Sequence, residues 1–291
     1  MPAGSADIKV RWRNKPIDLR SPSPFGLTAA GAADYRGAIV DPTELESARF
    51  SNVDFSQCDL RHSRFTKCHF ERCVFKRADL ALTVVTDCDF IDCDFSRADF
   101  RQALLGVWGT RFRACVFDGV RTAGCSPVNP EFETCNFRGE DWRNVRFWAA
   151  GFWSCSFSGE LTGAEFNGRG LFSTYKKMLN PKYRSGLHDI SFEYAKLRLV
   201  GCKDGCELEN VRMPLDGSSI ICAAADLVAL EHSDYNPELL SALKEYFSIL
   251  HLNPNDQPKQ IISRSDLDNL CAPQLADELY DLMRTKTAIT A

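Results

Sequence analysis

The chain has 291 residues, 44% of them hydrophobic and 25% charged, which is the composition of an ordinary folded protein with a sizeable core. Its formal net charge of -4 is too small to identify a partner by itself. The longest apolar stretch, SIICAAADLVAL, is too short for a membrane span and contains Asp226. No charged and apolar leader opens the sequence, so we expect a cytoplasmic protein whose cysteines stay reduced.

Residues 1–32 are the first expected element. They contain an apolar IKVRW stretch and a proline-rich RSPSPF segment, and they do not share the periodicity of the residues that follow. Because a repeat array needs its open end covered, this segment is predicted to be an N-terminal cap.

A period of five residues begins at Tyr35 and matches neither a helix nor a strand, whose side chains return to one face every 3.6 and 2 residues. A large apolar residue recurs at every fifth position, and a small residue stands two places before it, as in DCDFIDCDFSRADF. The register gains two residues in GVWGT, weakens through RTAGCSPVNP and continues to Phe157. The first fifteen large centres are Tyr35, Val40, Leu45, Phe50, Phe55, Leu60, Phe65, Phe70, Phe75, Leu80, Val85, Phe90, Phe95, Phe100 and Leu105.

Units such as ADLAL, CDFID and ADFRQ resemble the pentapeptide-repeat family over about residues 33 to 166. The resemblance implies a mainly β fold, a right-handed quadrilateral β-helix in which four pentapeptides form one square coil with the central and small residues inside. One such unit cannot bury its apolar side, whereas coils stacked at strand spacing build a continuous core. We therefore predict a β-helix over residues 33–213, with roughly six coils before residue 166.

Nine cysteines occupy the small inward position, which explains most of the unusual cysteine content. Their spacings of five, ten, fifteen or twenty do not match the C-x-x-C pattern of a zinc site. Pairs twenty residues apart, such as Cys68 and Cys88, are expected to stack on adjacent coils as buried thiols. We predict no metal and no cofactor.

The segment 167–189 breaks the repeat and is interpreted as an insertion. Apolar residues at helical spacing and Pro181 predict a short amphipathic helix. The segment is basic, with five cations against Asp189; Lys176, Lys177 and Arg184 are among them. Trp148 and Trp153 each follow a repeat centre and should point outward on consecutive faces beside it. The insertion could instead cover them, and the sequence leaves both readings open.

Residues 214–291 lose the period of five and show helix signals. NPELLSALKEYFSILHL has a capping Asn236 and Pro237 at the first helical position, and a second helix is predicted over APQLADELYDLMRTK. From residue 222 onward there are eleven acidic and five basic residues. We interpret this segment as a helical cap or interaction segment, with a possible homodimer interface on its helices.

Outward positions on the coils carry columns of aspartate. Asp59, Asp79 and Asp99 are twenty residues apart and should stack on one face. Pentapeptide-repeat proteins that protect DNA gyrase are thought to imitate DNA with an acidic rod. Residues 46 to 166, however, contain 17 acidic and 15 basic side chains, so the charge is largely balanced. The competing interpretation is that each Asp braces its turn by bonding to nearby backbone.

Common catalytic motifs are missing from the sequence, which favours a protein that is not an enzyme and acts by binding. The first hypothesis is an inhibitor of one protein partner, most concretely an immunity protein that neutralises a bacterial toxin domain such as a DNase; this follows a looser resemblance to pentapeptide-repeat immunity proteins. It uses Trp148, Trp153, Lys176, Lys177 and Arg184. The alternative is protection of DNA gyrase or topoisomerase IV through Asp59, Asp79 and Asp99. Direct nucleic-acid binding and membrane association are not expected, and an enzyme in the C-terminal helices is a weaker third option.

Overall fold

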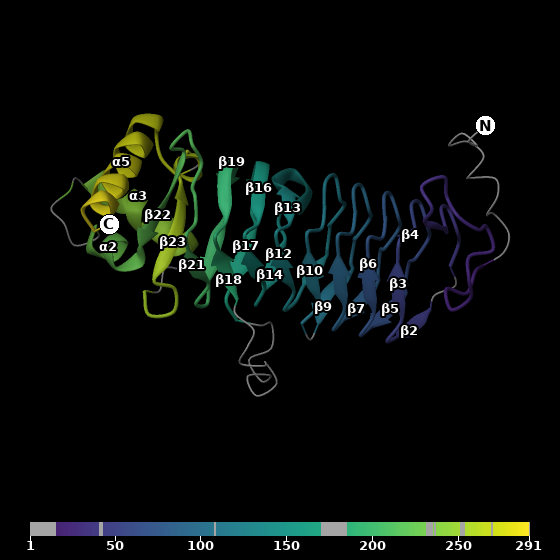
Figure 1. Cartoon of the computed structure of the whole chain (residues 1–291). Coiled ribbons are helices and arrows are strands. Elements are labelled where there is room, and N and C mark those ends of the chain that lie inside the picture. Colours follow the sequence, from purple (N-terminus) through teal and green to yellow (C-terminus); the bar gives the residue numbers. More distant parts are fainter. Residues whose placement is uncertain are drawn as a thin grey trace.

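The protein is a four-sided β-solenoid with a helical module at its C-terminal end (Figure 1). The computed structural model describes residues 16–40, 43–107, 109–169, 185–230, 235, 237–250, 254–268 and 270–290. The predicted β-helical fold is confirmed. One face runs through eight coils: six lie before residue 166, as the sequence predicted, and two follow residues 170–184.

Each coil crosses four faces, and strands of one face pair in parallel with those of the next coil. Face 2 is an eight-stranded sheet made of β3 (Arg49–Ser51), β6 (His69–Glu71), β8 (Asp89–Ile91), β10 (Arg111–Arg113), β12 (Glu131–Glu133), β15 (Gly151–Trp153), β18 (Gly186–His188) and β21 (Glu207–Glu209). Centres pair with centres throughout this sheet, as Phe70 does with Phe90. The twenty-residue register therefore places equivalent side chains in columns.

The other faces follow the same register. Face 1 contains β2 (Glu44–Glu46), β5 (Arg64–Thr66), β7 (Val84–Thr86), β9 (Leu104–Val107), β11 (Ser126–Pro127), β14 (Arg146–Trp148), β17 (Glu165–Asn167) and β20 (Gly201–Lys203). Face 3 contains β1 (Ala33–Asp34), β4 (Val53–Asp54), β13 (Asn136–Arg138), β16 (Ser156–Thr162) and β19 (Ser191–Arg198), joined by single bridges. Face 4 is held by bridges that run from Ile39 to Arg121, and the 3-10 helix η1 (Gly139–Trp142) turns there.

A left-handed residue turns each corner and explains the period of five. From Ser47 to Gln102 every fifth residue has a positive φ of 51–61°, although none of them is glycine. This conformation costs roughly 1–2 kcal/mol in each residue. The cost is offset because the turn residue bonds to the next coil; the Asn52 N–H, for example, donates to the Glu71 carbonyl at 2.9 Å. A short extended run and a two-residue corner therefore make one side of the square.

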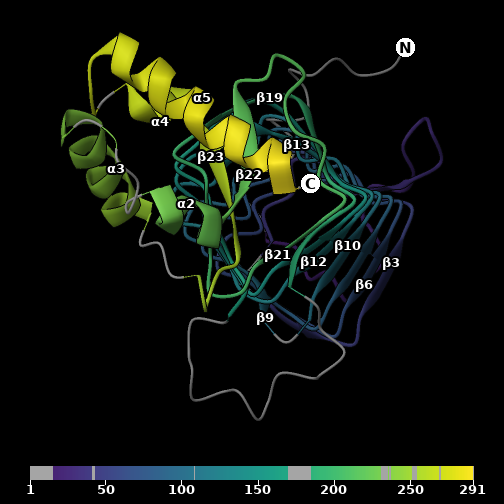
Figure 2. The ribbon, with the colours of Figure 1, turned by 90° about the vertical axis from the view of Figure 1, so that its left-hand side faces the viewer.

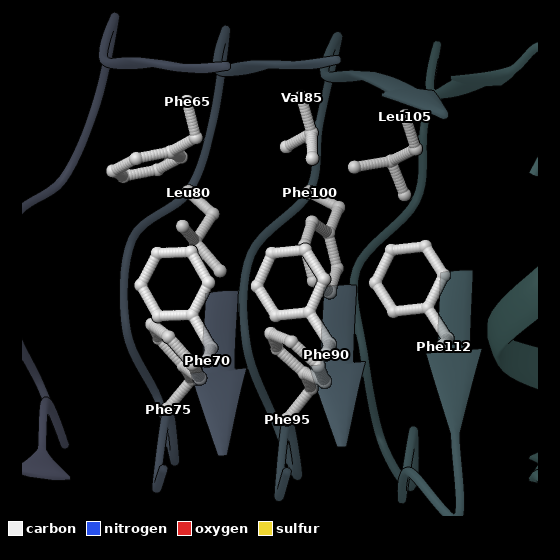
Figure 3. Close-up of a pocket in the computed structure, with 10 residues that line it drawn as sticks. All are labelled: Phe65, Phe70, Phe75, Leu80, Val85, Phe90, Phe95, Phe100, Leu105 and Phe112. Carbon is white, nitrogen blue, oxygen red and sulfur yellow. The ribbon is translucent and has the colours of Figure 1, made fainter. Parts of the chain in front are cut away.

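Aromatic columns fill the interior. The rings of Phe70 and Phe90 stack with centroids 4.7 Å apart, and Phe90 stacks on Phe112 at 4.9 Å. Figure 3 shows these rings beside Phe75 and Phe95, which form the next column. Burial of the centres and of the small residues confirms the inward positions that the sequence predicted.

Cysteines form a second kind of column. Cys73, Cys93, Cys115, Cys135 and Cys155 occupy equivalent positions in five successive coils, and Cys68 lies next to Cys88. All thirteen cysteines are free, and twelve are buried. Each thiol of the column donates to a carbonyl of the preceding coil, as Cys155 Sγ does to the Phe132 oxygen at 3.4 Å. Burial raises the pKa of Cys115 and Cys155, so these thiols pack as neutral groups.

The C-terminal module covers part of the last coil. It contains an antiparallel pair, β22 (Ser219–Ala223) and β23 (Lys259–Ser263), and the helices α2 (Ala224–Leu230), α3 (Pro237–Leu250), α4 (Arg264–Leu267) and α5 (Pro273–Thr290). Its strand β23 joins two cores, since Ile261 packs into the solenoid and Ile262 into the helical core. Helices α3 and α5 confirm the two predicted helices, whereas the β22–β23 pair was not predicted. None of the described helices could cross a membrane.

Polar side chains of the module complete the hydrogen bonds of the last coil. Gln257 accepts from the Cys206 N–H at 2.8 Å and donates to the Cys206 carbonyl at 2.9 Å, as a neighbouring strand would. The Asp266 carboxylate accepts from the Leu199 N–H at 2.7 Å. Burial raises the pKa of Asp266 to about 6. The module is therefore attached through buried polar contacts as well as apolar ones.

The predicted homodimer has no evident apolar surface on these helices. Leu239, Leu243 and Phe247 of α3 and Leu279 and Met283 of α5 are all buried in one helical core. Among the described side chains of α3 and α5, no large apolar residue is fully exposed. The helices use their apolar faces inside one chain.

Candidate functional site

The aspartate column of face 4 is neutralised by arginine. Arg61 bonds to Asp59 at 2.6 Å and lies 3.5 Å from Asp79, while Arg101 and Arg121 lie 2.7 and 3.3 Å from Asp99. The hydrogen bond from Arg61 lowers the pKa of Asp59. Burial alone would raise the pKa of Asp99, but hydrogen bonds from Arg101 lower it. The lowered pKa values keep Asp59 and Asp99 ionised and paired with arginine at neutral pH.

Each aspartate of this column also braces its own turn. Oδ1 of Asp59, Asp79 and Asp99 accepts the N–H two residues later at 3.1–3.2 Å. Their side chains are 29%, 36% and 10% exposed, so Asp99 is nearly covered. A structural role for the column is supported by these contacts, and little uncompensated negative charge reaches solvent there.

Trp148 and Trp153 lie on consecutive faces. Trp148 ends β14 on face 1 and pairs with Asn167, and Trp153 ends β15 on face 2; both side chains are half-buried. The Trp153 ring stacks on the His188 ring with centroids 5.4 Å apart and an interplanar angle of 9°. Their role in binding stays a prediction. Lys176, Lys177 and Arg184 lie outside the described residues, as does the helix predicted around them.

Two glutamates of β21 extend the Trp153–His188 stack. Glu209 Oε2 is 3.1 Å from His188 Nδ1, and Glu207 Oε2 is 3.8 Å from His188 Nε2. The His188 side chain is only 7% exposed, and its Nε2 atom has no hydrogen-bond partner among the described residues. The glutamate side chains are 63% and 62% exposed. We call Trp153, His188, Glu207 and Glu209 the terminal acidic site.

Glycine at position 186 allows this arrangement. Its φ of +133° disfavours other residues, and a Cβ there would stand 2.9 Å from the Glu207 Cβ. The same Cβ would stand 2.7 Å from the Glu207 carbonyl oxygen, so strand β21 itself would have to shift if position 186 carried a side chain.

The terminal acidic site differs from the face 4 column in its charge balance. Within the described chain Glu207 and Glu209 contact His188, and neither glutamate is paired with a lysine or an arginine. By contrast, Glu133 in the same side-chain column is paired with Arg113 at 2.7 Å. The last strand of face 2 therefore presents uncompensated carboxylates next to an aromatic ring.

Sequence reasoning missed His188, Glu207 and Glu209. Trp153 and His188 are equivalent positions in adjacent coils but are 35 residues apart, because residues 170–184 interrupt the register. Counting in steps of twenty therefore fails at this place. The sequence did contain a signal for Glu207 and Glu209, because residues 207–209 read Glu-Leu-Glu. The edge strand Glu44–Glu46 has the same composition.

The residues that the structure describes contain no group of three His, Cys, Asp or Glu side chains placed to hold a metal ion. The interior space shown in Figure 3 is lined by phenylalanine, leucine and valine alone, so it offers no polar anchor for a substrate or cofactor.

Comparisons with known proteins gave matches by sequence and by structure. The family model for pentapeptide repeats matches residues 43–80 and 68–106. No curated protein matches the chain.

Solved structures were matched as well, at low sequence identity and low TM-score. Trypsin-treated QnrB1, described as a plasmid-mediated fluoroquinolone resistance protein, is 20% identical, with 64% of this chain and 92% of QnrB1 covered and a TM-score of 0.22. HetL, involved in heterocyst differentiation regulation in the cyanobacterium Nostoc sp. strain PCC 7120, is 18% identical, with 64% and 89% covered and a TM-score of 0.29. Rfr23 from the cyanobacterium Cyanothece 51142 is 11% identical, with 62% and 90% covered and a TM-score of 0.22.

Proposed function

Because this chain is a pentapeptide-repeat protein, we propose that it is a non-catalytic binding protein that blocks a basic protein partner, most concretely a bacterial toxin domain that acts on DNA. The observation that carries this proposal is that Glu207 and Glu209, beside Trp153, have no lysine or arginine partner among the described residues. Proteins that bind nucleic acid present lysine and arginine to phosphates. An acidic surface of complementary shape can occupy the same cations and steer association.

The terminal acidic site has the composition of a protein interface. A half-buried tryptophan supplies contact area, and exposed carboxylates form a polar rim around it. In the preceding coils Asp59, Asp79 and Asp99 are instead paired with arginines and bonded to backbone N–H groups. Binding at the C-terminal end of face 2 is therefore favoured over binding along the aspartate column.

The test pairs the purified chain with the product of a toxin-like reading frame beside its gene. We expect a one-to-one complex in isothermal titration calorimetry and loss of the toxin's nuclease activity. The double substitution Glu207→Lys and Glu209→Lys should weaken binding at least tenfold, because truncated or reversed interface charges cost several kcal/mol. Glu44→Lys with Glu46→Lys is the matched control on another Glu-Leu-Glu strand. Absence of both complex and inhibition would refute the proposal.

Topoisomerase protection stays the alternative prediction. A DNA gyrase or topoisomerase IV supercoiling assay with a quinolone poison decides between the two, using the same preparations. Relief of poisoning that is lost on substitution of Asp59, Asp79 and Asp99 would favour the alternative. The pairing of these residues with arginine leads us to expect no relief.

A further inference from the structure

The strand β21 is an open edge of the solenoid. It lies at one end of the eight-stranded sheet and pairs only with β18 among the strands that the structure describes. The Asp189 N–H donates to the Glu209 carbonyl, so the backbone groups of Glu209 point to β18 and those of Leu208 point away. Outside the β18–β21 pairing, no described group bonds to the Leu208 N–H or C=O. Such an edge is a template for another strand.

The C-terminal module covers other parts of the last coil but leaves this edge uncovered. Side chains of the module bond to the backbone of Leu197, Leu199 and Cys206. Figure 2 shows the helices over one side of the coil end and β21 on the other side. Leu208 remains half-buried at the end of the core.

An edge strand of identical composition shows what a covered edge looks like. Strand β2, at the N-terminal end of face 1, is also Glu-Leu-Glu. There the Arg20 guanidinium donates to the Glu44 carbonyl at 3.1 Å, and Leu19 is buried in the core that contains Leu45. An apolar residue followed by a cation thus covers a Glu-Leu-Glu edge within this molecule.

Cross-strand ion pairs add a second precedent. On face 2, Arg111 bonds to Asp89 of the preceding coil at 2.7 Å, and Arg113 bonds to Glu133 of the following coil at 2.7 Å. A strand placed beside β21 would set its side chains against Glu207, Leu208 and Glu209 in the same register. Cationic, apolar and cationic residues would match these three.

We propose that the β21 edge binds an extended segment of a protein partner in which cationic residues alternate with an apolar residue, as a ninth strand of face 2. This proposal rests on the proposed function and specifies its partner. The segment's backbone bonds to Leu208, its apolar side chain covers Leu208, and its cations pair with Glu207 and Glu209. Main-chain bonds supply affinity and the alternating side chains supply specificity.

A peptide is the better fit than a second solenoid end. The helices α2, α3 and α5 project beyond the last coil beside β21 (Figures 1 and 2). A rod approaching head to tail would meet these helices, whereas a single extended segment needs only the open edge. In such a head-to-tail contact, the second copy would place its strand Arg49–Ser51, from the opposite end of face 2, beside β21. A substitution in that strand therefore tests whether a second copy occupies the edge.

The first experiment uses the full chain and a capped seven-residue peptide of alternating arginine and leucine. We expect saturable binding and at least tenfold slower hydrogen–deuterium exchange of the Leu208 amide. A peptide of the same sequence with N-methyl groups on the edge-facing amides keeps all side chains but loses those donors, and it should bind at least tenfold more weakly. Equal binding of both peptides, or no protection of Leu208, would overturn the proposal.

Substitutions separate charge from fold. Glu207→Lys with Glu209→Lys should abolish binding of the arginine peptide and create binding of a glutamate–leucine peptide. Glu44→Lys with Glu46→Lys should change the affinity less than twofold. Concentration-dependent oligomers of the chain alone that disappear on Arg49→Glu would assign the edge to a second copy and overturn the peptide assignment.

The peptide assay is independent of any toxin. Strand addition by the peptide together with no toxin binding would contradict the proposed function and leave the edge site standing. Toxin binding without protection of the Leu208 amide would contradict the edge site and leave the proposed function standing.

Discussion

The coils between residues 43 and 106 and the C-terminal module satisfy the same backbone groups in different ways. In the coils the N–H of the corner residue His62 donates to the Ala81 carbonyl of the next coil, and Leu82 and Gln102 repeat the bond in the two coils that follow. At the last coil the Leu199 N–H donates to the carboxylate of Asp266, which lies 67 residues later in the chain. Repetition spreads stability over many equal contacts, whereas the module concentrates it in a few polar side chains.

The largest effect is expected for Phe90→Ala in the middle of the repeats. Phe90 is buried between Phe70 and Phe112, and its removal leaves a cavity that neighbouring coils cannot close. We expect a loss of about 3–5 kcal/mol in the free energy of unfolding. Urea denaturation followed by circular dichroism measures it. The exposed corner substitution Arg97→Ala is the control, and a comparable loss there would contradict the packing argument.

The second effect is expected for Gln257→Leu at the junction. The substitution leaves the Cys206 N–H and C=O without their partners, at a cost of about 3 kcal/mol in total. Hydrogen exchange should quicken around residues 199–206 and remain slow around residues 60–100. Gln257→Glu keeps the acceptor for the Cys206 N–H but loses the donor to the Cys206 carbonyl. Its exchange rates around residues 199–206 should therefore lie between those of the wild type and of Gln257→Leu. Uniform faster exchange along the rod would show that the two regions unfold as one unit.

The third effect depends on pH and concerns Asp266. Because burial raises its pKa to about 6 from an ordinary value of 3.8, the folded protein holds a proton that the unfolded chain releases. Stability should therefore fall as pH rises from about 4 to about 6, by roughly 2 kcal/mol, and then stay level. Asp266→Asn removes this group's contribution.

The measurement is the difference in unfolding free energy between the wild type and Asp266→Asn at pH 4.5 to 7.5. Taking the difference cancels carboxylates such as Asp59, whose lowered pKa acts in the opposite direction. A difference that does not change with pH would show that Asp266 is already ionised in the folded protein.

The smallest effects are expected on the aspartate column. Asp79 is 36% exposed, and its contacts are one backbone N–H and the Arg61 side chain. Asp79→Ala should cost less than about 1 kcal/mol, since exposed ion pairs contribute little. Asp99→Ala should cost more, because Asp99 is nearly buried between Arg101 and Arg121. Thermal unfolding of the two variants compares them, and equal shifts would contradict this ranking.

Local pattern was sufficient for much of the fold. The period of five placed Phe70 and Phe90 inside, and the capped run at Pro237 indicated α3, because both signals depend on neighbours close in sequence. The β22–β23 pair escaped prediction because SIICAAADLVAL reads as one apolar run, although its first part is a strand and its second part is α2. The partner of β22 lies some 40 residues away, which no local pattern reveals.

The sequence by itself determined the coil, its inward residues and the columns of free cysteines, because one coil contacts the next at a constant spacing. Only the tertiary structure decided which carboxylates are compensated. Asp79 and Glu207 are alike as residues, but the fold gives one an arginine and leaves the other beside a histidine at an open edge. That outcome depends on where the register is interrupted and on which edges the C-terminal module covers, and both are set by contacts between distant parts of the chain.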